Sequence, residues 1–347
     1  MNHNKKNTKI IDAIDLQNEK KVNDFLKNEG YYSKTHTFPI ASLIFELTHH
    51  CNLSCRHCYN NSGNNGIEDM MTPQKWIDFA RYIVECGGVF ECVLSGGEPL
   101  LLGEKLFELM DIFHDDGTIF YLNTNGYLLS TKVVEKLSKY RYHKIQISID
   151  GATPEYHDWF RQRPGSWHNA VEGAKLIAKN GLPLKIAHCV TPKNINEIDI
   201  MCELAHSLGA SIIMVGELCY SGRASTNKEL LLSLEQKDYL FKKVRENLLK
   251  YNGRMKVRCS HSVKEGLERH YKSPNSDATI RPNGDIRIDS MAPFVVGNVL
   301  RDDFKEIWCK KIHTAWNHPL VKEFVNSFDE LDRSSLYTNY VEDDIYL

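Results

Sequence analysis

The sequence predicts an α/β fold, in which a partial (β/α)6 barrel of the TIM type is followed by a smaller α+β extension. Between about residues 42 and 224, short β-branched runs alternate with amphipathic helical patterns, which is typical of parallel βα units. Six such units occur in order and no seventh is obvious, so we expect an open barrel. Polar clusters directly follow the predicted strands, and the C-terminal strand ends carry the chemistry in TIM-type barrels.

Each predicted element rests on its own pattern. Six runs rich in β-branched and aromatic residues are predicted strands, at residues 42–48, 90–95, 118–123, 143–149, 184–190 and 211–218. Five stretches between them repeat apolar residues at helical spacing and are predicted helices, at residues 72–86, 104–116, 131–140, 169–181 and 195–209. Thr72 and Ser130 are predicted N-caps, and Gly181 and Gly209 are predicted helix stops.

The chain divides into three predicted regions: an N-terminal segment at 1–40, the barrel at 41–225 and the C-terminal extension at 226–347. In the extension, alternating strands flank Asn283-Gly284, which is a strong hairpin turn signal. The N-terminus lacks the apolar stretch of a secretory signal and no run is apolar enough to span a membrane, so we expect a cytoplasmic protein without membrane contact. A formal net charge of -2 offers no general attraction for nucleic acid.

Three of the ten cysteines are crowded directly after the first predicted strand, as Cys51, Cys55 and Cys58. This pattern favours reduced thiols and a metal centre over disulfides. Iron–sulfur clusters are bound by cysteine thiolates, and three local cysteines leave one iron open to a substrate or cofactor. The alternative is a zinc site completed by His49, His50 or His57.

The spacing Cys-x3-Cys-x2-Cys followed by Tyr59 resembles the signature of the radical S-adenosylmethionine (AdoMet) superfamily. The resemblance implies one [4Fe–4S] cluster on these cysteines, with the amino and carboxylate groups of AdoMet on the open iron. It implies reductive cleavage of AdoMet to methionine and a 5′-deoxyadenosyl radical, which abstracts hydrogen from substrate. It also implies an electron donor such as flavodoxin or ferredoxin.

The ends of the following strands fit the same resemblance. Gly96-Gly97-Glu98-Pro99 is similar to the family's GGEP motif, which implies contact with the methionine amino group. The clusters after the third and fourth predicted strands look like the family's adenosine and ribose region. Farther along, Arg161 is a candidate cation for the AdoMet carboxylate. The further candidates are Thr124, Asn125, Ser148, Asp150 and Arg223.

The region beyond the barrel resembles the SPASM or twitch extension of peptide-modifying maturases. Residues 280–289, 297–300 and 304–308 follow its order of a hairpin, a Gly-Asn turn and a short helix ending in Trp308. Where auxiliary-cluster cysteines belong, this chain has residues 273–277 and Asp289. We therefore expect a degenerate extension without auxiliary clusters, serving as a wall for the substrate. Only three other cysteines could approach it: Cys219, Cys259 and Cys309.

The leading functional prediction is an enzyme that modifies a ribosomally made peptide by epimerisation or cross-link formation. Loss of auxiliary clusters makes a net oxidation harder to explain and favours redox-neutral epimerisation, with a thiol among those three cysteines as the hypothetical hydrogen donor. The second reading is an AdoMet radical enzyme of cofactor or small-molecule biosynthesis, such as haem modification. The third is a non-catalytic iron–sulfur or zinc regulatory protein.

Overall fold

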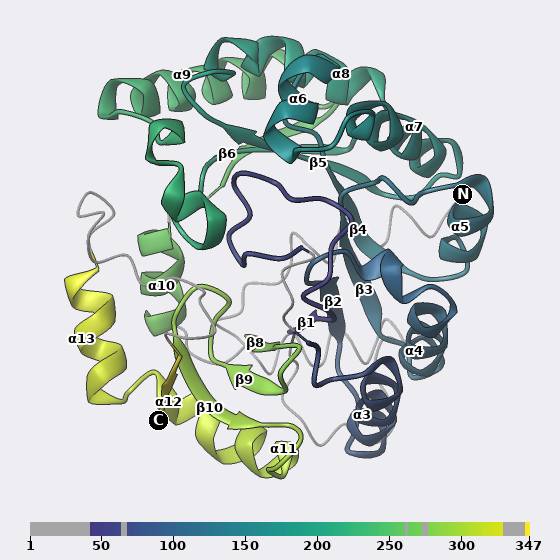
Figure 1. The fold of residues 1–347 in the computed structure, drawn as a ribbon, viewed down its shortest axis with the longest axis vertical. Helices are drawn as coiled ribbons and strands as arrows, with labels where there is room; N and C mark the ends of the chain where they lie inside the picture. The colour runs from purple at the N-terminus through teal and green to yellow at the C-terminus, as the bar shows by residue number, and fades with distance from the viewer. Residues whose placement is uncertain (1–41, 64–67, 261–262, 273–276, 329–343) are drawn as a thin grey trace.

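The fold is a single curved sheet with helices around its outside, seen in a computed structural model of the chain (Figure 1). The structure describes residues 42–63, 68–260, 263–272, 277–328 and 344–347. The predicted N-terminal segment and most of the C-terminal tail lie outside these residues. The sheet has eleven strands in the order β11-β10-β9-β8-β1-β2-β3-β4-β5-β6-β7.

The six predicted barrel strands are confirmed and pair in parallel with their sequence neighbours. This order is that of an open barrel, and the loop carrying the cysteines lies at its centre in Figure 1. The strands are β1 (Ser42–Glu46), β2 (Glu91–Ser95), β3 (Ile119–Thr124), β4 (Tyr142–Ser148), β5 (Leu184–Val190) and β6 (Ile212–Glu217).

Two strands outside the predicted six pair in parallel with the ends of that set. β7 (Lys256–Cys259) pairs in parallel with β6, and β8 (Asp277–Ile280) pairs in parallel with β1. β7 escaped the sequence pattern because it has only four residues and exposes Lys256 and Arg258 on either side of Val257. The division of the chain at residue 225 stays a prediction, although helix α9 (Leu234–Lys250) and β7 continue the βα alternation beyond it.

The helical patterns are confirmed with small shifts at their ends. The Thr72 hydroxyl accepts from Lys75 N at 3.3 Å and the Ser130 hydroxyl accepts from Val133 N at 3.3 Å, as expected of N-caps. One barrel helix, α6 (Pro154–Arg161), was not predicted because its eight residues follow a turn sequence. The others are α3 (Pro73–Glu85), α4 (Glu104–Asp115), α5 (Thr131–Leu137), α7 (Ser166–Lys179) and α8 (Ile198–Ser207).

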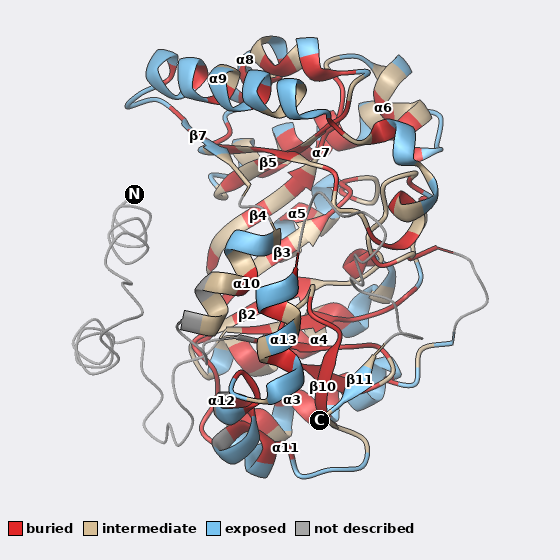
Figure 2. Ribbon diagram, turned by 90° about the vertical axis from the view of Figure 1, so that its left-hand side faces the viewer, coloured by how far each residue is buried: buried red, intermediate tan, exposed pale blue. Residues whose placement is uncertain are grey.

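The main core lies between the outer face of the sheet and these helices. Phe45 of β1 packs against Trp76 of α3 and Phe113 of α4, with ring centroids 5.0 and 5.8 Å apart. Trp76 Nε1 donates to Leu47 O at 2.9 Å, which satisfies the buried indole and fixes α3 against the end of β1. Buried residues follow the sheet through the molecule in Figure 2. The alternate residues of the strands face the barrel interior, where polar side chains gather.

The C-terminal extension continues the sheet on the far side of β1. β8 and β9 (Asp285–Arg287) form the predicted antiparallel hairpin, and β10 (Phe294–Asn298) pairs with β9. Asn298 Nδ2 donates to Asn283 O at 3.1 Å and to Asp285 Oδ1 at 2.8 Å, which ties the hairpin turn to β10. The remaining elements are α10 (Val263–Lys272), α11 (Phe304–Glu306), α12 (Ile312–Ala315), α13 (Pro319–Ser327) and β11 (Ile345–Tyr346).

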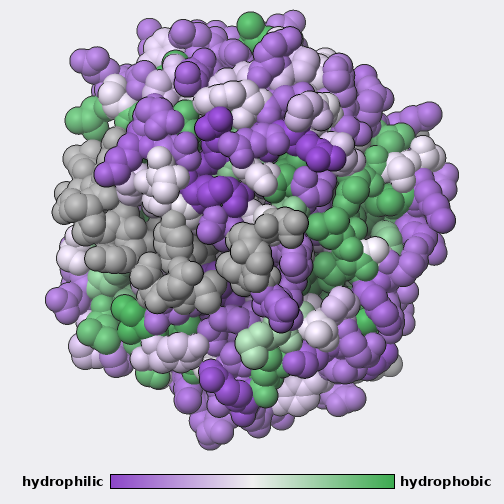
Figure 3. Space-filling model, viewed as in Figure 1, coloured by the Kyte–Doolittle hydropathy of each residue, from purple (hydrophilic) through white to green (hydrophobic). Residues whose placement is uncertain are grey.

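Among the described residues, no helix is both long enough and apolar enough to cross a membrane. The face of the molecule that presents the cysteine loop is mostly hydrophilic, with hydrophobic side chains gathered on the side of the view where α4 and α5 lie (Figure 3).

Candidate active site

The cysteine loop leaves β1 and is held against the Gly-Gly-Glu-Pro segment that follows β2. Gly97 N donates to Thr48 O at 2.7 Å, and Glu98 N donates to His50 O at 3.0 Å. A Cβ at Gly97 would lie 2.0 Å from His50 O, so only glycine allows this approach. The resemblance to the GGEP motif implies that these glycines contact the methionine amino group. The structure shows that at Gly97 the close neighbour is the backbone of the cysteine loop.

A second clamp on the cysteine loop comes from the far side of the barrel, in the short 3-10 helix η3 (Gly222–Thr226) after β6. Arg223 donates through Nε to Cys55 O at 2.9 Å, through one terminal nitrogen to Asn61 Oδ1 at 3.1 Å and through the other to Ser62 O at 2.5 Å. Its backbone N also donates to Cys58 O at 2.9 Å. Arg223 thus holds the loop on both sides of the last cysteine.

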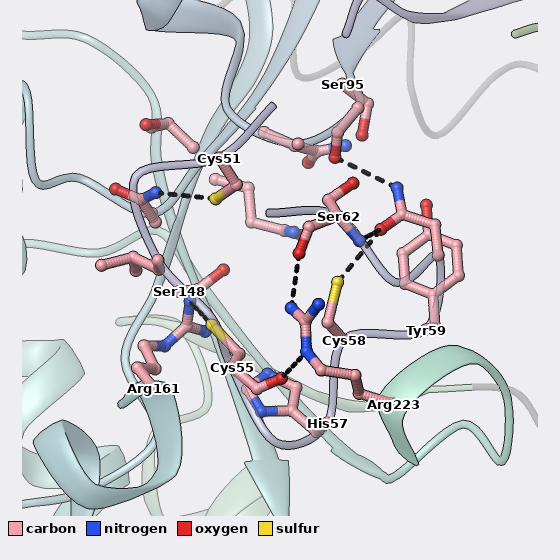
Figure 4. A pocket seen from close by; sticks show the side chains of 18 residues that line it. Cys51, Cys55, His57, Cys58, Tyr59, Ser62, Ser95, Ser148, Arg161 and Arg223 are labelled. Atoms are coloured by element: carbon pink, nitrogen blue, oxygen red, sulfur yellow. Dashed lines mark hydrogen bonds between the residues drawn. The ribbon is translucent and has the colours of Figure 1, made fainter. Parts of the chain in front are cut away.

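These contacts shape a cavity of about 250 Å³ at the C-terminal ends of the strands (Figure 4). It brings together residues from the cysteine loop and from the ends of β2, β3 and β4, together with Arg161 at the end of α6. The predicted site residues that line it are Cys51, Cys55, Cys58, Gly96, Gly97, Thr124, Asn125, Ser148, Arg161 and Arg223.

Glu98 does not line the cavity, because its side chain is turned into the protein and is fully buried. Oε1 accepts from the Thr124 hydroxyl at 2.8 Å and from Leu100 N at 3.2 Å, and Oε2 accepts from Asn125 N at 2.8 Å. Burial raises the pKa of Glu98 to about 6, although these hydrogen bonds favour the ionised form and act in the opposite direction. Its carboxylate therefore fixes the end of β3, and with it the Asn125 side chain.

Asp150 also lies behind the cavity wall, with 1% of its surface exposed. Its Oδ2 accepts from Arg161 Nε at 2.8 Å and its Oδ1 accepts from Cys189 N at 2.9 Å. Burial alone would raise the pKa of Asp150, but the Arg161 guanidinium holds it well below the usual range. This pair aims Arg161 at the cysteine loop, where a terminal nitrogen lies 3.9 Å from Cys55 Sγ. The predicted AdoMet contacts of Glu98 and Asp150 stay predictions.

The three thiols suit a cluster that binds each cysteine through a different iron. All are free of disulfides, and Asn125 Nδ2 lies 3.8 Å from Cys51 Sγ. Burial raises the pKa of Cys51 to about 11 and that of Cys55 to about 12, so a cation is needed to hold them as thiolates. Among the described residues, no three His, Cys, Asp or Glu side chains converge on a single ion. Thiolates bound to separate irons need no such convergence.

Several lining residues were missed by the sequence reasoning. Asn123 and Gln146 face the cavity from β3 and β4, and Gln146 stands two residues before the predicted Ser148 on the same strand face. Strand alternation could therefore have found Gln146. Asn60 and Ser62 line the wall after the last cysteine, beside Tyr59 of the recognised motif, and only the fold of the loop could reveal these two.

In the extension, Asp289 stands where an auxiliary-cluster cysteine was looked for. Its Oδ2 lies 2.7 Å from His270 Nδ1, and its Oδ1 accepts from Met291 N at 2.6 Å and Ala292 N at 3.0 Å. The side chain at this position is therefore engaged in a turn and an ion pair. Cys259 ends β7 and Cys219 follows β6, so both lie at the same edge of the sheet. The side chain at position 309 and residues 273–276 lie outside the described residues.

Comparisons with known proteins agree with this geometry. Residues 45–205 match the family model of the radical SAM superfamily. The AdoMet-dependent heme synthase of Methanosarcina barkeri is 28% identical over 77% of this chain and 81% of that protein. The subtilosin biosynthesis protein AlbA of Bacillus subtilis is 26% identical over 82% of this chain and 63% of its own length. The solved structure of Streptococcus suis SuiB bound to S-adenosylmethionine superposes with a TM-score of 0.64 at 16% identity, covering 86% of this chain and 72% of that one. With the cysteine triad at the mouth of a matching barrel, residues 45–205 of this chain are similar to the radical SAM superfamily.

Proposed function

We propose that this chain binds one [4Fe–4S] cluster through Cys51, Cys55 and Cys58 and uses it with AdoMet to abstract hydrogen from a peptide. The observation that carries the proposal is the cavity in which three thiols meet polar groups from three strand ends and a buried arginine. When bound, the cluster and AdoMet supply the radical chemistry of the superfamily. The protein supplies orientation and keeps water from the reacting atoms.

Within this proposal each wall of the cavity has a part in binding AdoMet. Arg161, held by Asp150, offers a buried cation to the carboxylate of the methionine moiety. Gly96 and Gly97 present backbone to its amino group, while Ser148 and Asn125 border the adenosine. Glu98 holds Thr124 and Asn125 in place, because its carboxylate accepts from both.

A peptide is the substrate class that the comparisons favour. AlbA is a subtilosin biosynthesis protein, and two PqqA peptide cyclases align at 31% and 32% identity over 57% and 51% of their own lengths. The solved structures with this fold include SuiB bound to its precursor peptide SuiA, with a TM-score of 0.62. We infer that the open side of the barrel receives the peptide and that the 226–347 extension forms one wall of its site.

The reaction outcome proposed is redox-neutral epimerisation rather than cross-linking. The reason is the extension, where Asp289 is engaged with His270 and two backbone N–H groups instead of offering a thiolate to a second cluster. Epimerisation then needs a thiol that gives a hydrogen atom to the substrate radical and is afterwards restored by one electron and one proton from the reductant. Of the two described candidates, Cys219 and Cys259, Cys219 is the better one. It follows β6 directly before the Arg223 clamp, whereas Cys259 ends the outermost parallel strand β7.

Haem or another small molecule is the second candidate substrate. The heme synthase of Methanosarcina barkeri aligns over most of both chains, and its share of this chain extends beyond the barrel. A gene for a short precursor peptide beside the gene of this chain would favour a peptide substrate. Neighbouring genes for tetrapyrrole enzymes would favour haem or a related small molecule.

The test is anaerobic reconstitution followed by iron and sulfide counting and by release of 5′-deoxyadenosine with dithionite. We expect about four irons per chain, as one [4Fe–4S] cluster requires, and loss of iron and nucleoside release together in the Cys51→Ala/Cys55→Ala/Cys58→Ala variant. Cys86→Ala, at the end of α3, is the matched control. About eight irons would contradict the single cluster, and zinc without nucleoside release would contradict the catalytic proposal.

A further inference from the structure

Helix α9 carries a row of large apolar side chains on its water-facing surface (Figure 2). Leu234 is 62% exposed, Phe241 is 51% exposed and Leu248 is 47% exposed. The three residues stand seven positions apart, so on a helix of about 3.6 residues per turn they lie one above another along a single side. This apolar stripe runs for about 20 Å, and such an exposed row is typical of a contact surface.

The fold of the chain itself does not use the apolar stripe. The side of α9 that faces the barrel is a different one, with Leu240, Val244 and Asn247 buried. On the flank toward α8, Lys243 Nζ and Asn247 Nδ2 lie 2.7 and 2.6 Å from the carboxylate of Asp199. Helix α9 is therefore anchored to the barrel while the stripe stays open to a partner.

Two opposite charges border the apolar stripe along one edge. Asp238 stands three residues before Phe241 and Arg245 stands four residues after it, and both are exposed. On a helical wheel the two fall within about 60° of Phe241 on the same side. They are about 10 Å apart along the helix axis, too far to pair with each other. In the part of the chain that the structure describes, the ion pairs of α9 use Lys237 and Lys243 instead.

This pattern is self-complementary when α9 meets a copy of itself that runs in the opposite direction. A two-fold axis at Phe241 brings Leu234 against Leu248 of the partner subunit, and Phe241 against Phe241 of the partner subunit. The same axis keeps the charged edges of the two helices together and brings Asp238 level with Arg245 of the partner subunit to within about 2 Å along the axis. Each ion pair is thus formed twice, as an isologous contact requires.

We propose that α9 is the interface of a homodimer, in which the apolar stripes of two copies pack antiparallel and Asp238–Arg245 ion pairs close one edge. A uniformly acidic or basic partner would meet a like charge at one of these two residues, whereas a second copy matches both. Packed helices approach to about 8–10 Å, which lets the three side chains of each stripe interdigitate. One pair of helices about 25 Å long is small for a permanent interface, so the dimer dissociates on dilution.

The first measurement is sedimentation equilibrium of the reconstituted full chain between about 1 and 100 µM. We expect the mass to rise from the 40.0 kDa of one chain toward twice that value. Phe241→Lys places two ammonium groups at the two-fold axis and should raise the dimer dissociation constant by about tenfold or more. Tyr239→Lys adds the same charge to an exposed aromatic position of α9 outside the stripe and should dimerise as wild type does.

The second measurement exchanges the charges at the edge of the stripe. Asp238→Arg and Arg245→Asp each bring like charges together across the interface, so each should raise the dissociation constant by roughly threefold to tenfold at low salt. The double variant restores opposite charges and should return toward wild-type affinity. Circular dichroism checks that every variant is folded.

Three results would overturn the proposal. One is a wild-type chain that stays monomeric over the whole concentration range, whether or not Phe241→Lys then weakens peptide binding. Another is a dimer that Phe241→Lys leaves intact, which would place the interface elsewhere. The third is a double charge variant that dimerises no better than either single variant, which would exclude the antiparallel pairing of Asp238 with Arg245.

Discussion

Replacing Arg223 by alanine should loosen the cysteine loop without unfolding the barrel. The change removes three hydrogen bonds from one guanidinium, to Cys55 O, Asn61 Oδ1 and Ser62 O. Charged hydrogen bonds contribute roughly 1.5–3 kcal/mol each when isolated. The carbonyls of a half-buried loop recover part of this free energy by hydrogen bonding to water. We therefore expect the variant to lose about 2–4 kcal/mol of the free energy that holds the loop closed. That raises the population of open loop by roughly 30-fold to several hundred-fold.

The assay is the rate at which a chelator removes iron from the reconstituted protein under anaerobic conditions. Arg223→Ala should lose iron faster by a comparable factor, and Arg223→Lys should recover little of the difference because an ammonium cannot reproduce the guanidinium fork. Arg163→Ala, an exposed arginine over the Tyr127 ring, is the control. Equal rates of iron loss in wild type and Arg223→Ala would refute the idea that this side chain holds the loop.

Three further changes test other parts of the structure. Gly97→Ala should lower the free energy of unfolding by about 1–3 kcal/mol or more and impair iron retention, because the new Cβ would clash with His50 O. Gly266→Ala is the control, because a Cβ there meets nothing within 4 Å. Thermal unfolding of the two variants measures the difference. Asp150→Asn should lower the free energy of unfolding of the cluster-free protein by about 3–5 kcal/mol in urea, because it strands the buried Arg161 cation; a loss below about 1 kcal/mol would contradict this. Burial, with the nearby Arg258 and Lys144 charges, lowers the pKa of Lys185 to about 8. The unfolded chain therefore binds more protons between pH 8 and the ordinary lysine range near 10.4, so stability should rise with pH there, and Lys185→Met should abolish that rise.

The sequence predicted the barrel well because its strands are buried runs of distinct composition. Leu43 and Phe45 on one face of β1, for example, meet helices whose own apolar periodicity was visible. The prediction failed where an element is short or takes its stability from neighbours. β7 is held by pairing with β6, and α6 is held by its contacts with the cysteine loop. Neither source of stability is visible in a local window of sequence.

The candidate site, like the fold, could be predicted from the sequence only in part. The residues that line the cavity were found because they follow strands or repeat a recognised motif. What their side chains contact depends on tertiary distance: Glu98 and Asp150 turn away from the cavity to hold Asn125 and Arg161. Arg223 binds groups of the cysteine loop that lie more than 160 residues before it in the sequence, so no local pattern could predict these contacts.

The position of β1 has a consequence for how the enzyme is made. This strand pairs on one side with β2 and on the other with β8, where Ser42 faces Asp277 across most of the chain. During synthesis the strand that leads into the cysteine loop must therefore wait as an open sheet edge until the last third of the polypeptide has emerged. Iron delivered before that moment would meet a loop whose supporting strand is only half paired. Truncated chains that lack β8 would keep the apolar edge of β1 exposed, which favours aggregation. The sheet is therefore completed only in chains that are synthesised past β8.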